Sequence, residues 1–307
     1  MNRKTNKILS CALAALLLSQ SAAVGASAAS LNLSEHDYST DLYAYQEHKS
    51  ISSVPNRQLG SYNRTRVTVG GTVLSVGGVL IGGTYYIPFR AAANALGAEY
   101  SYSSATRTST MKIASLTLVV SDGTYTSYAN DRALFSMTPN VIMSDGRMYI
   151  PADIFAKATG LSLDSSSSAI AFSGSLRPLI AASKYYREDE VLWLARIIHA
   201  EAQGEALLGQ IAVGNVVLNR VRSKDFPNTI YSVIFDRKYG VQFSPILNGT
   251  IYNTPSYTSV LAAKICLDGF DISDGALYFL QPHLSTSSWI PKNRTYAFTI
   301  GNHDFYK

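Results

Sequence analysis

The sequence has few charged residues and few cysteines for its length. Charged residues make up 15% of the 307 residues and apolar residues 47%, a balance that allows a packed core and argues against a disordered chain. The net charge of +5 includes Arg3, Lys4 and Lys7, and without them 23 basic residues face 21 acidic ones, which leaves +2. So small an excess does not indicate a nucleic-acid partner.

The N-terminal 28 residues contain no acidic residue and no apolar run long enough for a typical membrane span. After a basic start, an apolar stretch runs from Ile8 to about Leu18, and small residues follow up to Ala26-Ser27-Ala28. This order predicts a secretory signal peptide over residues 1–28, cleaved after Ala28, and the short apolar run favours cleavage over an uncleaved anchor. We therefore expect a secreted protein without a stable membrane span.

The sequence contains only two cysteines, and Cys11 lies in the predicted signal peptide. Cys266 then has no partner for a disulfide within the mature chain, so core packing must hold the fold. Cys266 lies in an apolar helical run from Val260 to Leu267. This setting favours a buried, unreactive thiol.

Residues 29–64 are polar and show no sustained period, and we interpret them as a linker. From residue 65 to about residue 175, short apolar runs alternate with glycine, serine and aspartate. This pattern predicts a β-rich domain. Its expected strands include residues 66–69, 117–120 and 169–172.

The β-rich region contains an internal repeat. Tyr86-Ile87-Pro88 is followed after eight residues by Gly97, and Tyr149-Ile150-Pro151 is followed after eight residues by Gly160. A turn signal precedes each copy. Each copy predicts a strand that enters a helix through proline, with glycine at the helix end. Two related β-α units in one small domain follow from this repeat.

This repeat resembles the copper amine oxidase N-terminal-like domain over about residues 65–175. The resemblance implies a stalk or a wall-binding module of an exported bacterial protein, and both roles stay open. No histidine occurs between His48 and His199, so the region offers no imidazole ligand for copper.

From residue 183 to residue 307 the pattern is mostly helical. The predicted fold class is therefore α+β, with a small β-rich two-repeat domain followed by a mostly helical domain that has a small sheet. The first helix has an apolar face from Val191 to Ala202 and acidic residues at its start. The other expected elements are a helix from about Ala206 to Arg222, a short helix opened by Pro227, a helix from Ser256 to Gly269, and strands at residues 276–280 and 295–300.

Glu201 ends the first of these helices, three and four residues after Ile198 and Ile197. A carboxyl group in apolar surroundings has a raised pKa and can donate a proton near neutral pH. Cleavage of a glycosidic bond needs such a donor because the leaving sugar oxygen must be protonated. On spacing alone, a solvent-exposed glutamate at a helix end is the better interpretation.

A series of motifs around Glu201 changes this interpretation. Over about 120 residues the chain resembles the bacterial cell wall hydrolase family of spore cortex-lytic enzymes. The resemblance implies a lysozyme-like fold, a place in the cell wall or spore envelope, a role in germination, and peptidoglycan glycan strands as the partner. The motifs are LARIIHAEAQGE (194–205), GQIAV (209–213), VLNRV (217–221), FPNT (226–229), QFS (242–244), IYNTP (251–255), GALYF (275–279) and IGNH (300–303).

The resemblance implies that Glu201, the first glutamate of E-A-x-G-E, is the catalytic acid. Several members of the family are lytic transglycosylases, in which one carboxyl group acts first as acid and then as base, with no cofactor and no metal. Gln203 and His199 depart from the family pattern, where arginine and tyrosine are common. These departures put the substrate preference and the pKa of Glu201 in doubt.

Further polar residues of the motifs are candidates for binding the glycan. Sugar rings stack on aromatic side chains, and their hydroxyl groups pair with amides and phenols. This favours Gln242, Tyr278 and Asn302, although Tyr278 fits a sheet core equally well. We expect Glu205 to cap the second helix, with a substrate contact as its other possible role. Four further acids are interpreted as solvated or capping residues, namely Asp236, Asp268, Asp271 and Asp274.

Three other functions stay open. A hydrolytic muramidase or glucosaminidase would use a second carboxylate. A metal-dependent amidase would have to assemble His199, Glu201, His283 and His303, whose spacing is not that of a helical ligand pair. A non-catalytic wall-binding protein is the third. Vegetative wall and spore cortex are both possible substrates.

Overall fold

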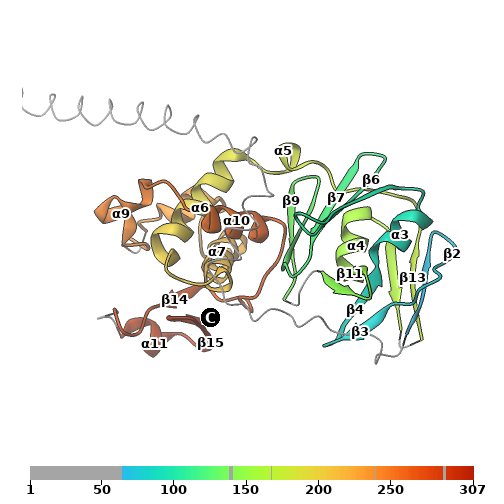
Figure 1. The fold of residues 1–307 in the computed structure, drawn as a ribbon. Helices are drawn as coiled ribbons and strands as arrows, with labels where there is room; N and C mark the ends of the chain where they lie inside the picture. The colour runs from blue at the N-terminus through green and yellow to red at the C-terminus, as the bar shows by residue number, and fades with distance from the viewer. Residues whose placement is uncertain (1–63, 138–140, 167, 239, 286–287) are drawn as a thin grey trace, which may run out of the picture. The chain divides into compact units, whose positions relative to one another are not determined.

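The computed structural model describes residues 64–137, 141–166, 168–238, 240–285 and 288–307. The predicted signal peptide and nearly all of the predicted linker lie outside the described residues. The predicted α+β class is confirmed, because a β-rich N-terminal region precedes a mostly helical region with a small sheet (Figure 1). Within the described ranges, no helix is both long and apolar enough to cross a membrane.

The two copies of the repeat pair with each other at the centre of the β-rich region. Strand β4 (Thr84–Pro88) runs antiparallel to β11 (Arg147–Pro151), and Ile87 lies opposite Ile150. Each strand passes directly into a helix, α3 (Phe89–Ala95) or α4 (Ala152–Thr159). The predicted β-α units are therefore confirmed.

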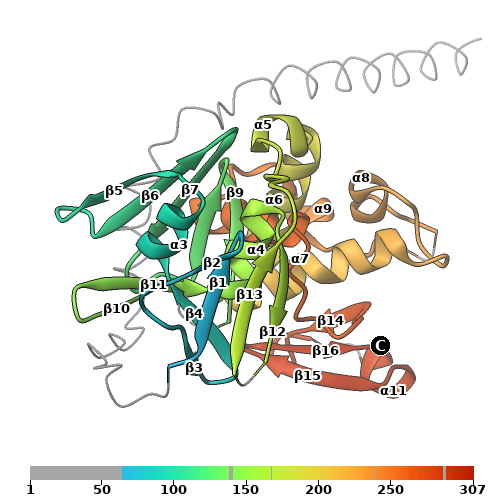
Figure 2. The same ribbon diagram turned by 90° about the vertical axis from the view of Figure 1, so that its right-hand side faces the viewer.

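The repeat strands lie in one of three sheets. The apolar sides of their strands and of α3 and α4 form one core that contains Phe89, Phe155 and Phe172. Strand order is β12-β13-β1-β2 in the first sheet, β10-β11-β4-β3 in the second and β5-β6-β7-β8-β9 in the third (Figure 2). The remaining strands are β1 (Arg66–Val69), β2 (Thr72–Val73), β3 (Val79–Ile81), β5 (Glu99–Ser103), β6 (Thr108–Ile113), β7 (Leu116–Ser121), β8 (Thr126–Ala129), β9 (Arg132–Phe135), β10 (Ile142–Ser144), β12 (Ser162–Ser165) and β13 (Ala169–Ser173).

Three long helices pack together in the C-terminal region. They are α6 (Glu188–Ala202), α7 (Leu207–Arg222) and α10 (Tyr257–Leu267), and each contacts the other two. Most of α7 is buried, as its apolar circumference predicts. Short elements complete the region: α5 (Ala182–Tyr185), α8 (Ile230–Ile234), α9 (Pro245–Asn248), the 3₁₀ helix η3 (Thr250–Tyr252) and α11 (Trp289–Asn293).

Two local predictions were wrong. Pro227 does not open a helix, because α8 begins at Ile230 and Thr229 caps it by accepting a hydrogen bond from the Ser232 amide at 3.1 Å. The C-terminal sheet has three strands where two were predicted. Its order is β14 (Tyr278–Leu280), β16 (His303–Tyr306) and β15 (Tyr296–Ile300), with the unpredicted β16 in the middle.

Asp268, predicted to be solvated or capping, occupies the C-cap position of α10, but its carboxylate lies in a buried ion pair and is not solvated. Its Oδ1 accepts hydrogen bonds from Nε and Nη2 of Arg132 in β9, at 2.8 and 2.6 Å. The Tyr186 hydroxyl also donates to its carboxylate, and the Lys157 ammonium donates to its main-chain oxygen at 2.8 Å. This cluster joins the end of α10 to the β-rich region.

Replacing Asp268 should destabilise the chain strongly. In Asp268→Asn the Arg132 guanidinium would stay buried without its carboxylate, which costs about 3–5 kcal/mol in such pairs. Asp274→Asn is a matched control because its pair with Lys307 is exposed, and exposed pairs contribute at most about 1 kcal/mol. Chemical denaturation should separate the two variants, and equal losses would contradict a stabilising role for the buried pair.

Candidate active site

Helix α6 places Glu201 in its last turn, beside a fully buried apolar face. Ile197 and Ile198, one turn earlier, have no exposed surface. Glu201 itself is half-buried, so its carboxyl group keeps some access to solvent. Burial raises its pKa to about 7, and the positive charge of Arg220 partly opposes this rise. A carboxyl group with this pKa is protonated in a substantial fraction of molecules at neutral pH.

Arg220 is the cation whose charge lowers the pKa of Glu201, and its side chain is almost completely buried. It lies near the end of α7, and its Nε donates to the Leu277 oxygen at 2.7 Å. The rings of Phe226, Phe243 and Tyr278 surround it at 4.9, 5.1 and 5.4 Å. Its Nη1 is buried and has no hydrogen-bond partner among the described residues. Burial lowers its pKa to about 10.

Arg220 was not among the residues predicted from the sequence. A single arginine in a helix gives no sign of its depth, and only its place in the VLNRV motif, on the helix that follows Glu201, could have drawn attention to it. Tertiary packing brings its three aromatic neighbours from separate segments, so their spacing in the sequence carries no signal. The cation is nevertheless the feature that links Glu201 to the aromatic residues.

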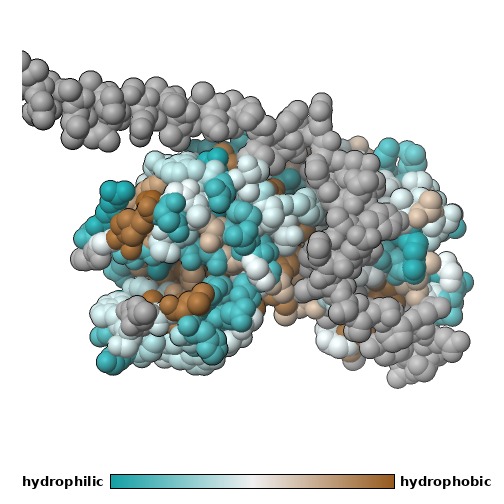
Figure 3. All heavy atoms as spheres, turned by 60° about the vertical axis from the view of Figure 1, so that its left-hand side comes forward, coloured by the Kyte–Doolittle hydropathy of each residue, from teal (hydrophilic) through white to brown (hydrophobic). Residues whose placement is uncertain are grey.

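Tyr278 lies between two arginines. Arg220 approaches its ring at 5.4 Å and Arg294 at 4.5 Å, and the Trp289 ring lies edge-on at 6.3 Å. About half of the Trp289 side chain is exposed, so this aromatic cluster reaches the surface. In Figure 3, apolar surface appears on the helical part and on the C-terminal part below it, with an indentation between them.

The sequence predicted that Glu205 caps α7, and this prediction was wrong. Ala206 is the N-cap, and no side chain caps this helix. The Glu205 carboxylate instead accepts hydrogen bonds from the Asn302 amide Nδ2 at 2.9 Å and from the Asn302 backbone N–H at 3.3 Å. It thereby joins the start of α7 to the turn between β15 and β16. Glu205 and Asn302, both predicted to contact substrate, are bonded to each other.

Among the remaining candidates, Gln242 makes a local contact, and the two histidines contact segments farther away in the sequence. Gln242 donates to the Gly240 oxygen at 3.2 Å, within its own loop. His199 accepts from the Ser256 amide at 3.3 Å, and burial lowers its pKa. His303 lies within hydrogen-bonding distance of Gln281, at 3.2 Å, and burial also lowers its pKa. Across the described ranges, no group of three or more histidine, cysteine or acidic side chains is arranged to hold a metal ion.

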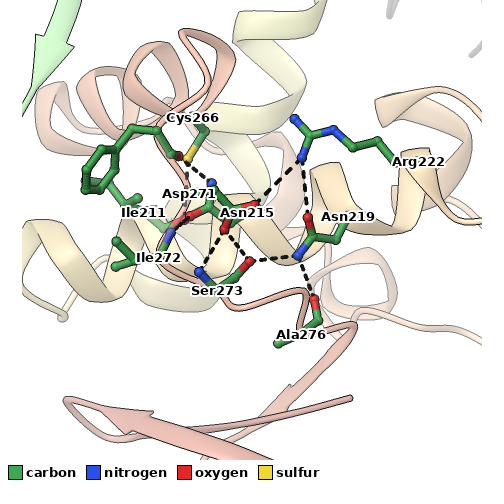
Figure 4. A network of polar contacts seen from close by, with 10 residues as sticks. Ile211, Asn215, Asn219, Arg222, Cys266, Asp271, Ile272, Ser273 and Ala276 are labelled. Atoms are coloured by element: carbon green, nitrogen blue, oxygen red, sulfur yellow. Dashed lines mark hydrogen bonds and ion pairs between the residues drawn. The ribbon is translucent and has the colours of Figure 1, made fainter. Parts of the chain in front are cut away.

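A polar network holds the chain between α10 and β14 against α7 (Figure 4). The Asn215 side chain donates to the Phe270 oxygen at 2.9 Å and accepts from the Ile272 amide at 3.1 Å. One turn later, Asn219 donates to Ser273 and to the Ala276 oxygen. These bonds fix the segment that leads into β14, and they therefore help to position Tyr278.

Cys266 lies beside this network and confirms the expected buried thiol. Its Sγ donates to the Ile211 oxygen at 3.4 Å, and burial raises its pKa. A thiol of this kind is rarely ionised and is a poor nucleophile.

The chain matches two protein families. The match to "Copper amine oxidase N-terminal domain" covers residues 68–171, and the match to "Cell Wall Hydrolase" covers residues 204–306. The cell wall hydrolase CwlJ of Oceanobacillus iheyensis is 32% identical over 103 residues, which make up 72% of that protein. The chain belongs to the cell wall hydrolase family.

Other members of the family match a shorter share of their own length. A spore cortex-lytic enzyme of Bacillus cereus is 38% identical over 122 residues, which cover 40% of this chain and 46% of that enzyme. A similar solved structure is the catalytic domain of the germination-specific lytic transglycosylase SleB from Bacillus anthracis, with 38% identity, 40% of this chain and 97% of that chain covered, and a TM-score of 0.37. The family match begins at residue 204 and does not include Glu201. The choice of Glu201 as the candidate acid therefore depends on the geometry described above.

The contact between Glu205 and the β15–β16 turn predicts a large effect of a small substitution. Gly301 has a φ of 59°, and a Cβ added there would collide with the Glu205 carboxylate. Gly301→Ala should therefore lower the free energy of unfolding more than Gly275→Ala, where φ is 73° and no heavy atom lies within 4 Å of the added Cβ.

The control variant should show only the backbone strain, roughly 1–2 kcal/mol. Chemical denaturation measures both free energies. Equal losses in the two variants would contradict a close contact between Glu205 and the turn.

Proposed function

We propose that this chain is a secreted peptidoglycan lytic transglycosylase and that Glu201 is its single acid and base. The observation that carries the proposal is the half-buried Glu201 carboxyl group, with a pKa of about 7, beside the buried cation of Arg220. Membership in the cell wall hydrolase family and the similarity to named lytic enzymes support peptidoglycan as the substrate. The predicted signal peptide supports export.

In the first step, Glu201 donates its proton to the oxygen that links N-acetylmuramic acid to the next N-acetylglucosamine. The bond from this oxygen to C1 of the muramic residue breaks, and the N-acetylglucosamine leaves with a hydroxyl group. Glu201 is now a carboxylate. The positive charge of Arg220 stabilises this anionic form, because the two groups interact through poorly solvated surroundings.

In the second step, the Glu201 carboxylate accepts the proton of the C6 hydroxyl of the same muramic residue. The C6 oxygen bonds to C1 and forms a 1,6-anhydro ring, and Glu201 regains its proton for the next cycle. The reaction consumes no water. Glu201 must be protonated at the start, so activity should fall as the pH rises through its pKa.

The aromatic cluster beside Arg220 suits the binding of a glycan. Trp289 is half exposed and Tyr278 is half-buried, and both present ring faces or edges near the surface. Stacking of a sugar ring on such side chains would hold the strand beside Glu201. We propose Gln242 as a further polar contact, because its neighbour Phe243 packs against Arg220.

Replacing Glu201 with glutamine should abolish cleavage of purified peptidoglycan. The amide has no acidic proton, and general acid–base catalysis typically contributes about 10²–10⁴-fold to the rate. Glu188→Gln is the matched control, because Glu188 is an exposed acid in the first turn of the same helix. This control should keep wild-type activity. Comparable release of fragments by Glu201→Gln and the wild type would contradict the assignment of the acid.

Mass spectrometry of the wild-type products distinguishes the reaction types. Anhydro-muramic ends are expected, and reducing muramic ends would show a hydrolase instead.

Parallel digestions of peptidoglycan with and without muramic lactam separate spore cortex from vegetative wall as the substrate. Activity should survive exhaustive chelation, and its loss would favour the metal-dependent amidase. Binding without cleavage by the wild type would favour the non-catalytic role.

A further inference from the structure

The β-rich region contains a cavity of about 850 Å³. It lies between α3, β5 and the turn that joins β10 to β11, and Figure 2 shows these elements as neighbours. Pockets of roughly 300–1,000 Å³ are typical of small-molecule sites. All residues named for it lie outside the match to the cell wall hydrolase family.

Helix α3 and strand β5 each present a pair of side chains to this cavity, and the spacing of each pair puts both side chains on one face of their element. Arg90 and Asn94 are four residues apart on α3 and so share one face of the helix. Tyr100 and Tyr102 are two residues apart on β5 and so share one face of the strand. Strand β5 is at the edge of its sheet. The lining of the cavity therefore brings polar side chains of α3 next to aromatic side chains of β5.

The Tyr100 hydroxyl is already hydrogen-bonded to the Ser109 hydroxyl at 2.7 Å. The Arg90 guanidinium lies 5.1 Å from the centre of the Tyr100 ring. This cation–π contact positions the guanidinium and leaves its positive charge unneutralised. The Tyr100 ring is also supported from the edge by Phe89 at 5.8 Å. Tyr102 keeps 45% of its surface exposed. Such an arrangement is already ordered before a ligand arrives.

The charge of the cavity is positive. Arg147 joins Arg90 in the lining, and Asp145 is the one acid among the lining residues that the structure describes. The Asp145 carboxylate already faces Arg64 outside the lining, with 3.9 Å between Oδ2 and Nη2. Two guanidinium groups beside exposed tyrosine suit a ligand that combines a sugar ring with a carboxylate.

We propose that this cavity binds a segment of the peptidoglycan strand, with a tyrosine side chain against a sugar ring and the two arginines near a carboxylate of the lactyl group or peptide stem. This inference rests on the proposed function for its substrate class. It assigns the β-rich region a binding role, separate from the acid at Glu201. Attachment there would raise the local concentration of glycan for the catalytic site of the same chain.

Binding should be measured without cleavage. The full chain without its predicted signal peptide, carrying Glu201→Gln, is mixed with insoluble peptidoglycan and sedimented, and a soluble disaccharide-tetrapeptide is titrated in parallel. Arg90→Gln and Tyr102→Ala are added separately to this background. Arg66→Gln is the matched control, because Arg66 is an exposed arginine of β1 that does not line the cavity.

Arg90→Gln and Tyr102→Ala should each weaken binding roughly tenfold, the loss expected when one charge-assisted hydrogen bond or stacking contact is removed. Arg66→Gln should bind as the background does. Thermal unfolding of each variant checks the fold, and the two cavity variants provide independent tests. Equal binding by all variants, or no binding of the soluble fragment, would overturn the proposal.

Two further binding experiments identify which anionic group the two arginines bind. Peptidoglycan stripped of its phosphate-containing polymers should bind as well as untreated wall, and loss of binding after this treatment would assign the cavity to those polymers instead. Amidation of the free carboxylates of the soluble fragment should weaken its binding. Because no arm requires catalysis, failure here leaves the role of Glu201 untouched, and failure of Glu201 as the acid leaves this binding test intact.

Discussion

The burial of one carboxyl group beside one buried cation is the interaction on which the site depends. Removal of Glu201 from water favours its protonated form, and Arg220 limits that preference. If burial acted alone, the carboxyl group would give up its proton less readily. If the cation were fully exposed to water, its charge would be screened and would affect Glu201 little. Helices α6 and α7 keep both groups in poorly solvated surroundings.

The parts of the C-terminal region around this pair hold it in position. Asn215 and Asn219 fix the segment that carries Tyr278, and Glu205 holds the turn of the small sheet. Both sets of contacts connect α7 or its start to residues at least 50 positions away in the sequence. Helix α7 and the aromatic cluster are thus parts of one packed unit. Separately, the ion pair at Asp268 ties α10 to the β-rich region.

Much of the fold could be predicted from periodicity. The Y-I-P repeat gave both β-α units because proline and glycine mark strand and helix ends locally. The half-buried position of Glu201 was not predictable in this way, because its spacing alone favoured a solvent-exposed glutamate and only the surrounding motifs singled it out. The buried ion pair of Asp268 and the contact of Glu205 with the turn could not be predicted, because their partners lie far away in the sequence, at Arg132 and Asn302. Arg220 was missed for the same reason: its burial comes from three separate segments.

The interaction between Glu201 and Arg220 can be measured through the pKa of Glu201 itself. Carboxyl ¹³C NMR of glutamate-labelled protein, with Glu201→Gln to assign the signal, follows its titration. We expect a midpoint of about 7 in the wild type. We expect a higher midpoint in Arg220→Met, and no change in Arg222→Met on the exposed end of the same helix. A wild-type midpoint near the ordinary glutamate value of about 4.3 would show that burial does not raise the pKa of Glu201.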